Sequence, residues 1–218
     1  MVSRPRMDAG IVPIKRLTRA KGRLEGHFSR GDCTRIAHAM FEDALALCRA
    51  VDFISWWVVS DDPDVIEAAA AQGVSTHQDR GAGLNPALVE AIALVIEAGG
   101  QSVTIFPSDI PLARRADLVD VLDTGATSDL VVVPSRADGG TNALYLSPAD
   151  LIEPQFGSGS LAAHVREAEE RRLRCSILPL ERMELDIDTI DDVDAFLELS
   201  SRESAGRTAE VLRELRSG

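Results

Sequence analysis

The chain has 218 residues, of which 45% are hydrophobic and 27% are charged, and this excludes a disordered chain because there is enough apolar material for a folded core. Its 23 Lys and Arg residues and 35 Asp and Glu residues give a formal net charge of −12, whereas proteins that bind nucleic acid or anionic membranes usually carry the opposite charge. No apolar run is long enough to span a bilayer, and the three cysteines have no metal-binding or disulfide spacing. We therefore expect a cytoplasmic protein that binds neither nucleic acid nor membranes and holds any anionic ligand with local positive groups or metal ions.

Short apolar runs alternate with helical patterns along the chain. The expected strands lie at residues 11–14, 53–59, 102–106, 130–133, 143–146 and 176–178, and the expected helices at 32–47, 65–72, 84–96, 117–122, 161–172 and 191–199. Unbroken apolar strands separated by helices are typical of a mostly parallel sheet that is covered on both faces. We predict one three-layer α/β/α, Rossmann-like domain over residues 1–199, with ligands beyond the carboxyl ends of its strands. Residues 200–218 are expected to form an amphipathic tail, whose apolar side chains permit a homodimer without requiring one.

A basic segment follows the first predicted strand. It places five cationic side chains within nine residues: Lys15, Arg16, Arg19, Lys21 and Arg23. Cationic groups near a strand end are suited to a polyphosphate, although the sequence has neither a Walker A motif nor G-x-G-x-x-G. A solvated basic loop is the alternative interpretation.

Three aspartates follow later strands. Asp109 lies in the segment P-S-D-I-P (residues 107–111), where two prolines hold the backbone directly after a buried strand. Asp186 and Asp188 form a D-x-D pair, and residues two apart in an extended segment point to the same face. Such close carboxylates repel one another unless a cation neutralises them, and oxygen ligands favour Mg²⁺ over zinc. The alternative is that these aspartates only cap the helices that follow.

Three glycine-containing loops offer backbone N–H groups. Residues 138–142 and 156–160 are suited to a small phosphorylated or carboxylated molecule, and the second loop opens a helix whose N-terminus favours an anion. Residues 81–85 enter another helix and are candidates for the wall of a base pocket. Ordinary tight turns are the alternative interpretation. The four histidines, His164 among them, have no metal-ligand spacing and are interpreted as core or surface residues.

Together these segments resemble the guanylyltransferases that act on 2-phospho-L-lactate or phosphoenolpyruvate in the biosynthesis of the deazaflavin coenzyme F-420. These enzymes are relatives of the molybdenum-cofactor guanylyltransferases. The resemblance covers about residues 11–197, and seven motifs carry it in order. They are V-P-I-K-x-L-x-x-A-K-x-R-L (12–24), V-S-D-D (59–62), G-L-N (83–85), P-S-D-I-P (107–111), G-G-T-N-A-L (139–144), F-G-S-G-S (156–160) and L-D-I-D-T (185–189).

The resemblance implies a single nucleotidyltransferase domain and a role for each motif. It implies that two Mg²⁺ ions are bound by Asp109, Asp186 and Asp188. It implies that GTP is bound by Lys15, Lys21, Arg23, Gly83, Leu84 and Asn85, and that Lys15, Lys21 and Arg23 also act in catalysis by neutralising the triphosphate and the leaving pyrophosphate. The phosphorylated acid is then bound by Thr141, Asn142, Gly157 and Ser160.

The implied reaction is transfer of GMP from GTP to the phosphate of a small acid, with release of pyrophosphate. A general base is not needed, because the second pKa of a phosphate monoester is about 6 and the nucleophile is already ionised at neutral pH. Phosphoenolpyruvate, 2-phospho-L-lactate and 3-phosphoglycerate differ by few atoms, so the choice among them stays open. Two other functions also stay open: another Mg²⁺-dependent nucleotidyl- or glycosyltransferase that uses a D-x-D pair, and a nucleotide-binding protein without catalytic activity.

Overall fold

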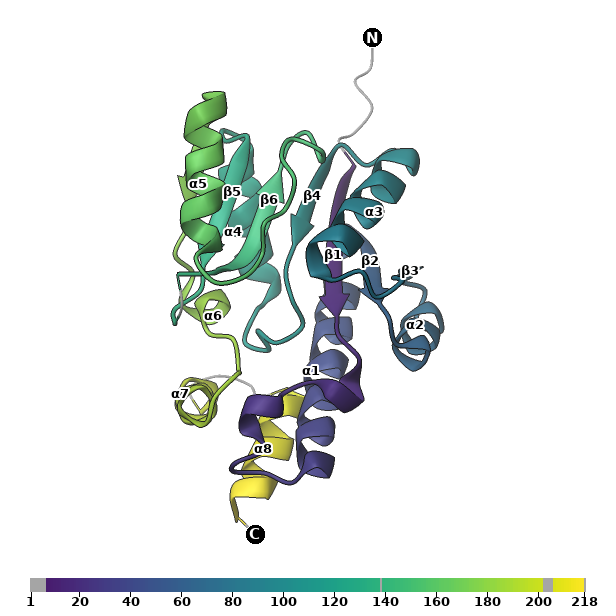
Figure 1. Ribbon diagram of the computed structural model, residues 1–218, viewed down its shortest axis with the longest axis vertical. Coiled ribbons are helices and arrows are strands. Elements are labelled where there is room, and N and C mark those ends of the chain that lie inside the picture. The colour runs from purple at the N-terminus through teal and green to yellow at the C-terminus, as the bar shows by residue number, and fades with distance from the viewer. Residues whose placement is uncertain (1–6, 138, 202–205, 218) are drawn as a thin grey trace.

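The computed structural model describes residues 7–137, 139–201 and 206–217. Its centre is a seven-stranded sheet (Figure 1). In spatial order the strands are β3 (Ser75–Gln78), β2 (Ser55–Ser60), β1 (Asp8–Ile14), β4 (Ser102–Ile105), β6 (Thr141–Leu146), β5 (Leu130–Pro134) and β7 (Cys175–Ile177). Neighbouring strands are parallel except where β6 runs antiparallel to both β4 and β5. The predicted mostly parallel sheet is therefore confirmed.

The reversed strand β6 determines which residues reach the edge of the sheet where β1 and β4 end. Ile105, at the end of β4, pairs with Ile11 of β1 in parallel register and with Leu144 of β6 in antiparallel register. Because β6 runs the other way, its first residues, Thr141 and Asn142, lie at that same edge. The sequence does not indicate this direction, since a strand buried on both faces is an unbroken apolar run whichever way it runs.

Helices cover both faces of the sheet, as Figure 1 shows. One face is covered by α1 (Arg30–Ala50), α2 (Pro63–Ala70), α4 (Arg115–Gly125) and α6 (Glu181–Glu184), and the other by α3 (Leu84–Glu97) and α5 (Ser160–Arg171). Successive strand residues alternate between the two cores: Val58 packs on the first side and Val59 on the second. The predicted three-layer α/β/α architecture is confirmed.

Two short elements were missed by the sequence analysis. The strand β3 has the sequence S-T-H-Q and lies at the edge of the sheet, where β2 is its one neighbour among the described strands, so it lacks the apolar run that marks a buried strand. The helix α6 has only four residues, which is too short for a helical period to be visible. Both elements are held by contacts with other parts of this chain: β3 pairs with β2, and α6 packs against β5 and β6.

The last two helices, α7 (Ile190–Ser200) and α8 (Arg207–Ser217), form a third core with the side of α1 that faces away from the sheet. Ala209 and Leu212 of α8 are fully buried there. Asp43 of α1 caps α8, because its two carboxylate oxygens accept hydrogen bonds from the backbone N–H groups of Arg207 at 2.7 Å and Thr208 at 2.9 Å. The buried apolar side chains of the tail are thus covered by their own chain rather than by a second copy. The division of the chain at residue 199 stays a prediction.

Within the described ranges, no helix combines the length and the apolar character needed to cross a bilayer.

Candidate active site

A cleft of about 660 Å³ opens beyond the carboxyl ends of β1 and β4, at the edge of the sheet where a ligand was expected. Most of the described residues that line it come from the segments 13–23, 79–84, 107–109, 140–142, 156–157 and 186–188. Each of the seven sequence motifs named above contributes at least two residues to the lining of the cleft. The cleft therefore brings together segments that are far apart in the sequence.

The basic segment folds over one wall of the cleft as two short 3₁₀ turns, Leu17–Arg19 and Gly22–Leu24. Leu17 and Leu24 are buried and anchor it to the body of the protein. The carboxylate of Asp62, which also caps α2, accepts a hydrogen bond of 3.2 Å from the backbone N–H of Leu17. Lys21, between the two turns, has a left-handed backbone with φ of 57°, a conformation that costs a non-glycine residue about 1 kcal/mol. With this backbone conformation the side chain of Lys21 points into the protein, where it is largely buried.

The ammonium of Lys21 lies between two of the predicted metal ligands. Its Nζ is 3.0 Å from Oδ2 of Asp109 and 3.0 Å from Oδ1 of Asp188, and its side chain is only 7% exposed. Burial acts to lower the pKa of Lys21, but the two carboxylates outweigh it and the pKa is raised. Lys21 is therefore a fully charged cation held at the base of the cleft.

The other cations of the segment are closer to solvent. Arg23 has a 75% exposed side chain, and its Nη1 lies 3.3 Å from Oδ2 of Asp188. Lys15 is exposed and acts on Asp188 through its charge alone. Although burial acts to raise the pKa of Asp188, the charges of Lys21, Arg23 and Lys15 together lower it. The carboxylate of Asp188 is accordingly ionised at neutral pH.

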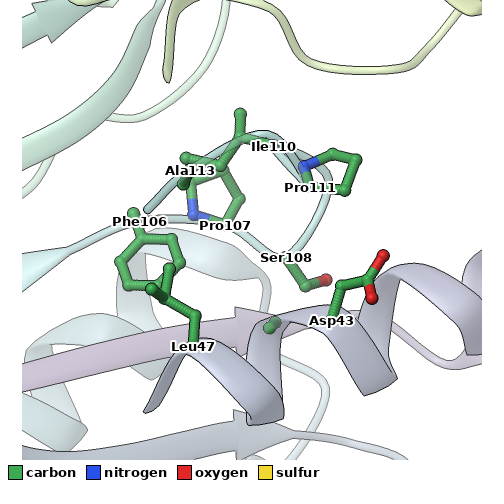
Figure 2. A pocket seen from close by; sticks show the side chains of 9 residues that line it. Asp43, Leu47, Phe106, Pro107, Ser108, Ile110, Pro111 and Ala113 are labelled. Carbon is green, nitrogen blue, oxygen red and sulfur yellow. The ribbon is translucent and has the colours of Figure 1, made fainter. Parts of the chain in front are cut away.

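Asp109 is held by a loop that packs on α1. Phe106 and Ile110 are buried in the same core as α1, and Figure 2 shows the loop lying over that helix, with Leu47 projecting toward it. The backbone carbonyl of Asp109 accepts a hydrogen bond of 3.0 Å from the N–H of Ile187, which joins this loop to the D-x-D segment. The Oδ1 atom of Asp109 is buried, and no residue in the described part of the chain donates a hydrogen bond to it. A buried carboxylate oxygen without a donor is costly unless a ligand or cation reaches it.

Asp186 is held by one residue of β6 and by one residue that directly follows β5. Its Oδ1 accepts hydrogen bonds from Nδ2 of Asn142 and from Oγ of Ser135, each 3.1 Å long. The same amide nitrogen of Asn142 donates to the backbone carbonyls of Met183 and Glu184 at 3.0 Å. Burial raises the pKa of Asp186 against the effect of the Asn142 hydrogen bond, and the charges of the two other aspartates add to the rise. Asn142, predicted to bind the acid, thus has its amide nitrogen engaged in positioning Asp186.

The alternative that these aspartates are only helix caps does not hold. The helix α4 begins after Arg114 and is closed by a capping box with Asp117. The helix α7 begins after Thr189, whose capping partner is Asp192. Asp109, Asp186 and Asp188 therefore cap neither helix. Asp186 and Asp188 alternate with the buried residues of the D-x-D segment and face the cleft together, as the spacing predicted.

The three aspartates do not form a ready-made metal cage. Among the described residues, no group of three His, Cys, Asp or Glu side chains is close enough to hold a metal ion. The ammonium of Lys21 lies between Asp109 and Asp188 instead. Mg²⁺ is usually bound by one or two carboxylates together with substrate phosphates and water, so this donor set fits an ion that arrives with a polyphosphate. Their assignment as metal ligands stays a prediction.

The opposite wall carries the glycine-rich turns. Thr141 and Gly157 line the cleft, and Gly157 has φ of 137°, which only glycine adopts without strain. Ser160 does not line the cleft, but its buried Oγ at the start of α5 has no hydrogen-bond partner in the described ranges. Gly83 and Leu84 line the cleft, whereas Asn85 does not.

The amide of Asn85 is used to hold the backbone of Phe156. Its Nδ2 donates to the carbonyl of Phe156 at 3.1 Å, and its Oδ1 accepts from the N–H of Phe156 at 2.9 Å. The predicted nucleotide loop is thus tied to the predicted acid loop. Sequence reasoning missed this tie, and it also missed Ser135 beside Asp186 and the hydrogen bond between Leu17 and Asp62, the residue that caps α2. Ser135 could have been found, because it is a polar residue that directly follows a buried strand.

Comparison with known proteins agrees with this geometry. A family model described as guanylyl transferase CofC like matches residues 8–217. A phosphoenolpyruvate guanylyltransferase from Conexibacter woesei is 36% identical over 211 residues, which cover 94% of this chain and 95% of the relative. A 2-phospho-L-lactate guanylyltransferase from Methanothermobacter thermautotrophicus is 35% identical, with 94% and 90% covered. A 3-phospho-D-glycerate guanylyltransferase from Phenylobacterium zucineum is 33% identical, with 97% and 98% covered.

A solved structure from Desulfovibrio desulfuricans, assigned as a nucleotide-diphospho-sugar transferase, has the same fold. It superposes with a TM-score of 0.82 at 18% sequence identity and covers 96% of this chain and 95% of that chain. At that identity the likeness concerns the fold alone. The family match and the curated relatives, by contrast, extend over nearly the whole sequence, and this chain belongs to the guanylyl transferase CofC like family.

Proposed function

We propose that this protein transfers GMP from GTP to the phosphate of a small phosphorylated acid and releases pyrophosphate, as a step in the biosynthesis of coenzyme F-420. The observation that carries the proposal is the cluster at the base of the cleft. There, Lys21 joins Asp109 to Asp188 between a basic wall and a wall of glycine-rich turns. The first wall is suited to a triphosphate and the second to a small anion. The printed names of the curated relatives describe guanylyl transfer to acids of this kind.

On the nucleotide side, Lys15, Lys21 and Arg23 neutralise the triphosphate and the leaving pyrophosphate in this proposal. Gly83 and Leu84 contribute to the wall of the base pocket, and Asn85 supports that wall through its bonds to Phe156. Lys21 is the central group, because it is the buried cation of the set and is already held by two carboxylates.

We propose that Asp109, Asp186 and Asp188 bind two Mg²⁺ ions together with the phosphates of GTP. The unpartnered Oδ1 of Asp109 supports this, since a cation would supply the partner that it lacks. When bound, the ions supply positive charge to the α-phosphate and to the departing pyrophosphate. The residues themselves orient the reactants, and Ser135 and Asn142 keep Asp186 in position.

The nucleophile in this proposal is a phosphate oxygen of the acid, which attacks the α-phosphorus of GTP in line with the leaving pyrophosphate. It needs no general base, because a phosphate monoester is largely ionised at pH 7. The described residues that line the cleft include no histidine, in agreement with this chemistry. Thr141, Gly157 and Ser160 hold the acid, with the N-terminus of α5 directed toward its charge.

The test is the release of pyrophosphate from GTP and Mg²⁺ with each of three acids in turn: phosphoenolpyruvate, 2-phospho-L-lactate and 3-phosphoglycerate. We expect release with one acid well above the others and loss of release when EDTA removes the metal. ATP and CTP in place of GTP test the choice of base. If none of the three acids gave pyrophosphate release, in protein whose thermal unfolding is cooperative, the proposal would be contradicted. Release of a nucleoside diphosphate from a nucleotide sugar would instead indicate a glycosyltransferase.

We also propose that residues 1–199 carry all the groups that act on substrate, and that the tail at 200–218 serves to hold α1. Leu212→Ala tests this, because it removes a fully buried side chain from α8. We expect a loss of about 2–5 kcal/mol in the free energy of unfolding, with the KM for GTP unchanged. A raised KM for GTP at a temperature where the variant is folded would contradict a purely supporting tail.

A further inference from the structure

His164 is a buried titratable group that the proposed mechanism does not use. It lies in α5 and is 0% exposed. Its Nδ1 is 3.1 Å from Oγ1 of Thr141, and its Nε2 is 3.0 Å from the backbone nitrogen of Gln155. Its ring meets the ring of Phe156 edge to face, with 5.9 Å between the centroids. His164 therefore joins β6 to the loop that forms one wall of the cleft.

These two hydrogen bonds determine where the proton of His164 is. A backbone N–H can only donate, so the Nε2 atom that it meets must be the bare, accepting nitrogen. Burial lowers the pKa of His164 to about 4, so the ring is neutral at pH 7 and carries one proton. That proton must be on Nδ1, and Nδ1–H consequently donates to the hydroxyl oxygen of Thr141.

The hydroxyl of Thr141 is oriented as a result. Its oxygen already accepts from His164, so its hydrogen is turned toward another acceptor. No other described residue forms a hydrogen bond with this oxygen, and Thr141 lines the cleft between Asn142 and Gly140. The hydrogen is thus available to a ligand in the cleft.

We propose that His164 is a positioning residue that makes Thr141 a dedicated hydrogen-bond donor to an anionic oxygen of the acid substrate. This inference rests on the proposed function. It assigns a direction to the contact: the group that meets Thr141 is an acceptor, such as a carboxylate or phosphate oxygen. If Nδ1 were bare, the hydroxyl of Thr141 would donate its hydrogen to the His164 ring, and the proton on Nδ1 removes that option.

The surroundings keep this arrangement rigid. Asn85 holds Phe156 through two hydrogen bonds, and Phe156 packs on the His164 ring. The N–H of Leu161 donates to the carbonyl of Gly139 at 3.1 Å, which fastens the start of α5 to the turn that precedes β6. His164 therefore cannot turn its ring without breaking the loop that supports the acid site.

Two substitutions of His164 separate its two hydrogen bonds. His164→Asn places an amide near the position of Nδ1 and keeps a donor for Thr141, whereas His164→Gln reaches the position of Nε2 and keeps an acceptor for Gln155. We expect His164→Gln to raise the KM for the acid by up to about ten-fold, with the KM for GTP unchanged, because the hydroxyl of Thr141 is then no longer held with its hydrogen toward the acid. His164→Asn should raise it much less. Equal effects of the two variants, or a larger effect of His164→Asn, would overturn the inference.

A double-mutant cycle tests whether His164 acts through Thr141. Thr141→Val removes the hydroxyl and should raise the KM for the acid about ten-fold, while Thr141→Ser restores the hydroxyl and the KM. In the Thr141→Val background, His164→Gln should have no further effect on this KM. Full additivity of the two substitutions would overturn the proposal, because His164 would then act by a separate route.

A measurement without substrate separates this inference from the proposed function. Long-range ¹⁵N–¹H correlation spectra report which ring nitrogen carries the proton, and the His164 signal is identified by its loss in His164→Gln. We expect the Nδ1–H form at pH 7, and the Nε2–H form would overturn the arrangement directly. If the Nδ1–H form is found but the protein releases no pyrophosphate with any acid, then the proposed function fails and the acid-binding role of Thr141 fails with it, while the proton position stands.

Discussion

Two aspartates in this protein pair with cations, Asp117 in a buried site and Asp109 in a partly exposed one, and they differ in how many of their oxygens have a hydrogen-bond donor. Asp117 is 1% exposed, and both of its oxygens have donors: the Nε and Nη2 atoms of Arg182, and the backbone N–H of Arg114 at 2.8 Å. Asp109 bonds to Lys21 through one oxygen, and its other oxygen is buried with no donor in the described ranges. An ion pair between an aspartate and a cation is thus found in two different settings in this protein. A complete set of partners indicates a structural pair, and an incomplete set indicates a place for a ligand.

The largest expected effect comes from the incomplete pair. Asp109→Asn or Asp188→Asn should lower the rate of pyrophosphate release by at least about 1,000-fold, because each removes a charge that faces the reacting phosphates. The free energy of unfolding should change little, since Asn can still accept a hydrogen bond from Lys21. Rate and chemical denaturation are measured on the same preparations. Either variant with a near-normal, Mg²⁺-dependent rate would remove that residue from the proposed site.

The matched control is the complete pair. Asp117→Asn should lower the free energy of unfolding by about 3 kcal/mol, because it removes the buried negative charge that Arg182 binds through Nε and Nη2. The rate per folded molecule should stay close to that of the unchanged protein. Urea denaturation and the pyrophosphate assay check both statements. If Asp117→Asn abolished the rate in folded protein, the contrast between the two pairs would be lost.

The two aspartate pairs can be compared by measuring stability at low pH only when the contribution of His164 to the pH dependence is known. Its pKa is about 4 in the folded protein and near 6.5 when unfolded, so below pH 6.5 the unfolded chain binds a proton that the folded protein does not. The free energy of unfolding therefore decreases as the pH is lowered from 6.5 to 4, and at pH 5 the share of His164 in this decrease is about 2 kcal/mol. His164→Gln should remove this share and give a shallower decline in the free energy of unfolding. Parallel curves for the two proteins would show that His164 is not buried in its neutral form.

The smallest effect is expected at the exposed end of the Lys21 cluster. Arg23→Ala removes an ion pair to Asp188 that is largely in solvent, so the free energy of unfolding should change by less than about 0.5 kcal/mol. The KM for GTP should rise only about three-fold, because Arg23 gives up a solvated contact. Titration with GTP at two salt concentrations checks this. A fall in rate as large as that of Asp109→Asn would show that Arg23 contributes far more to neutralising the phosphates than its exposed position implies.

The site could be predicted in part, because its chemistry lies directly after apolar strands. Asp109 follows β4, and Asp186 and Asp188 alternate with buried residues, so local sequence was enough to identify them. Asn142 and Asn85 were identified as site residues, but their hydrogen-bond partners were not. Those partners are backbone groups and the carboxylate of Asp186, 41 to 71 residues away, and no local pattern indicates such distant pairings.

By itself the sequence determined the layers of the fold and most of the segments that line the cleft. The layers follow from the period of the apolar residues and the cleft from the polar residues that come after strands, and both are local properties of the sequence. Only the tertiary structure decided the direction of β6, the covering of the tail by α1 and the place of Lys21. Lys21 meets carboxylates that are 88 and 167 residues further along the chain. The physical reason is that hydrogen bonds and charges act over a few ångströms in space, whatever the distance along the chain.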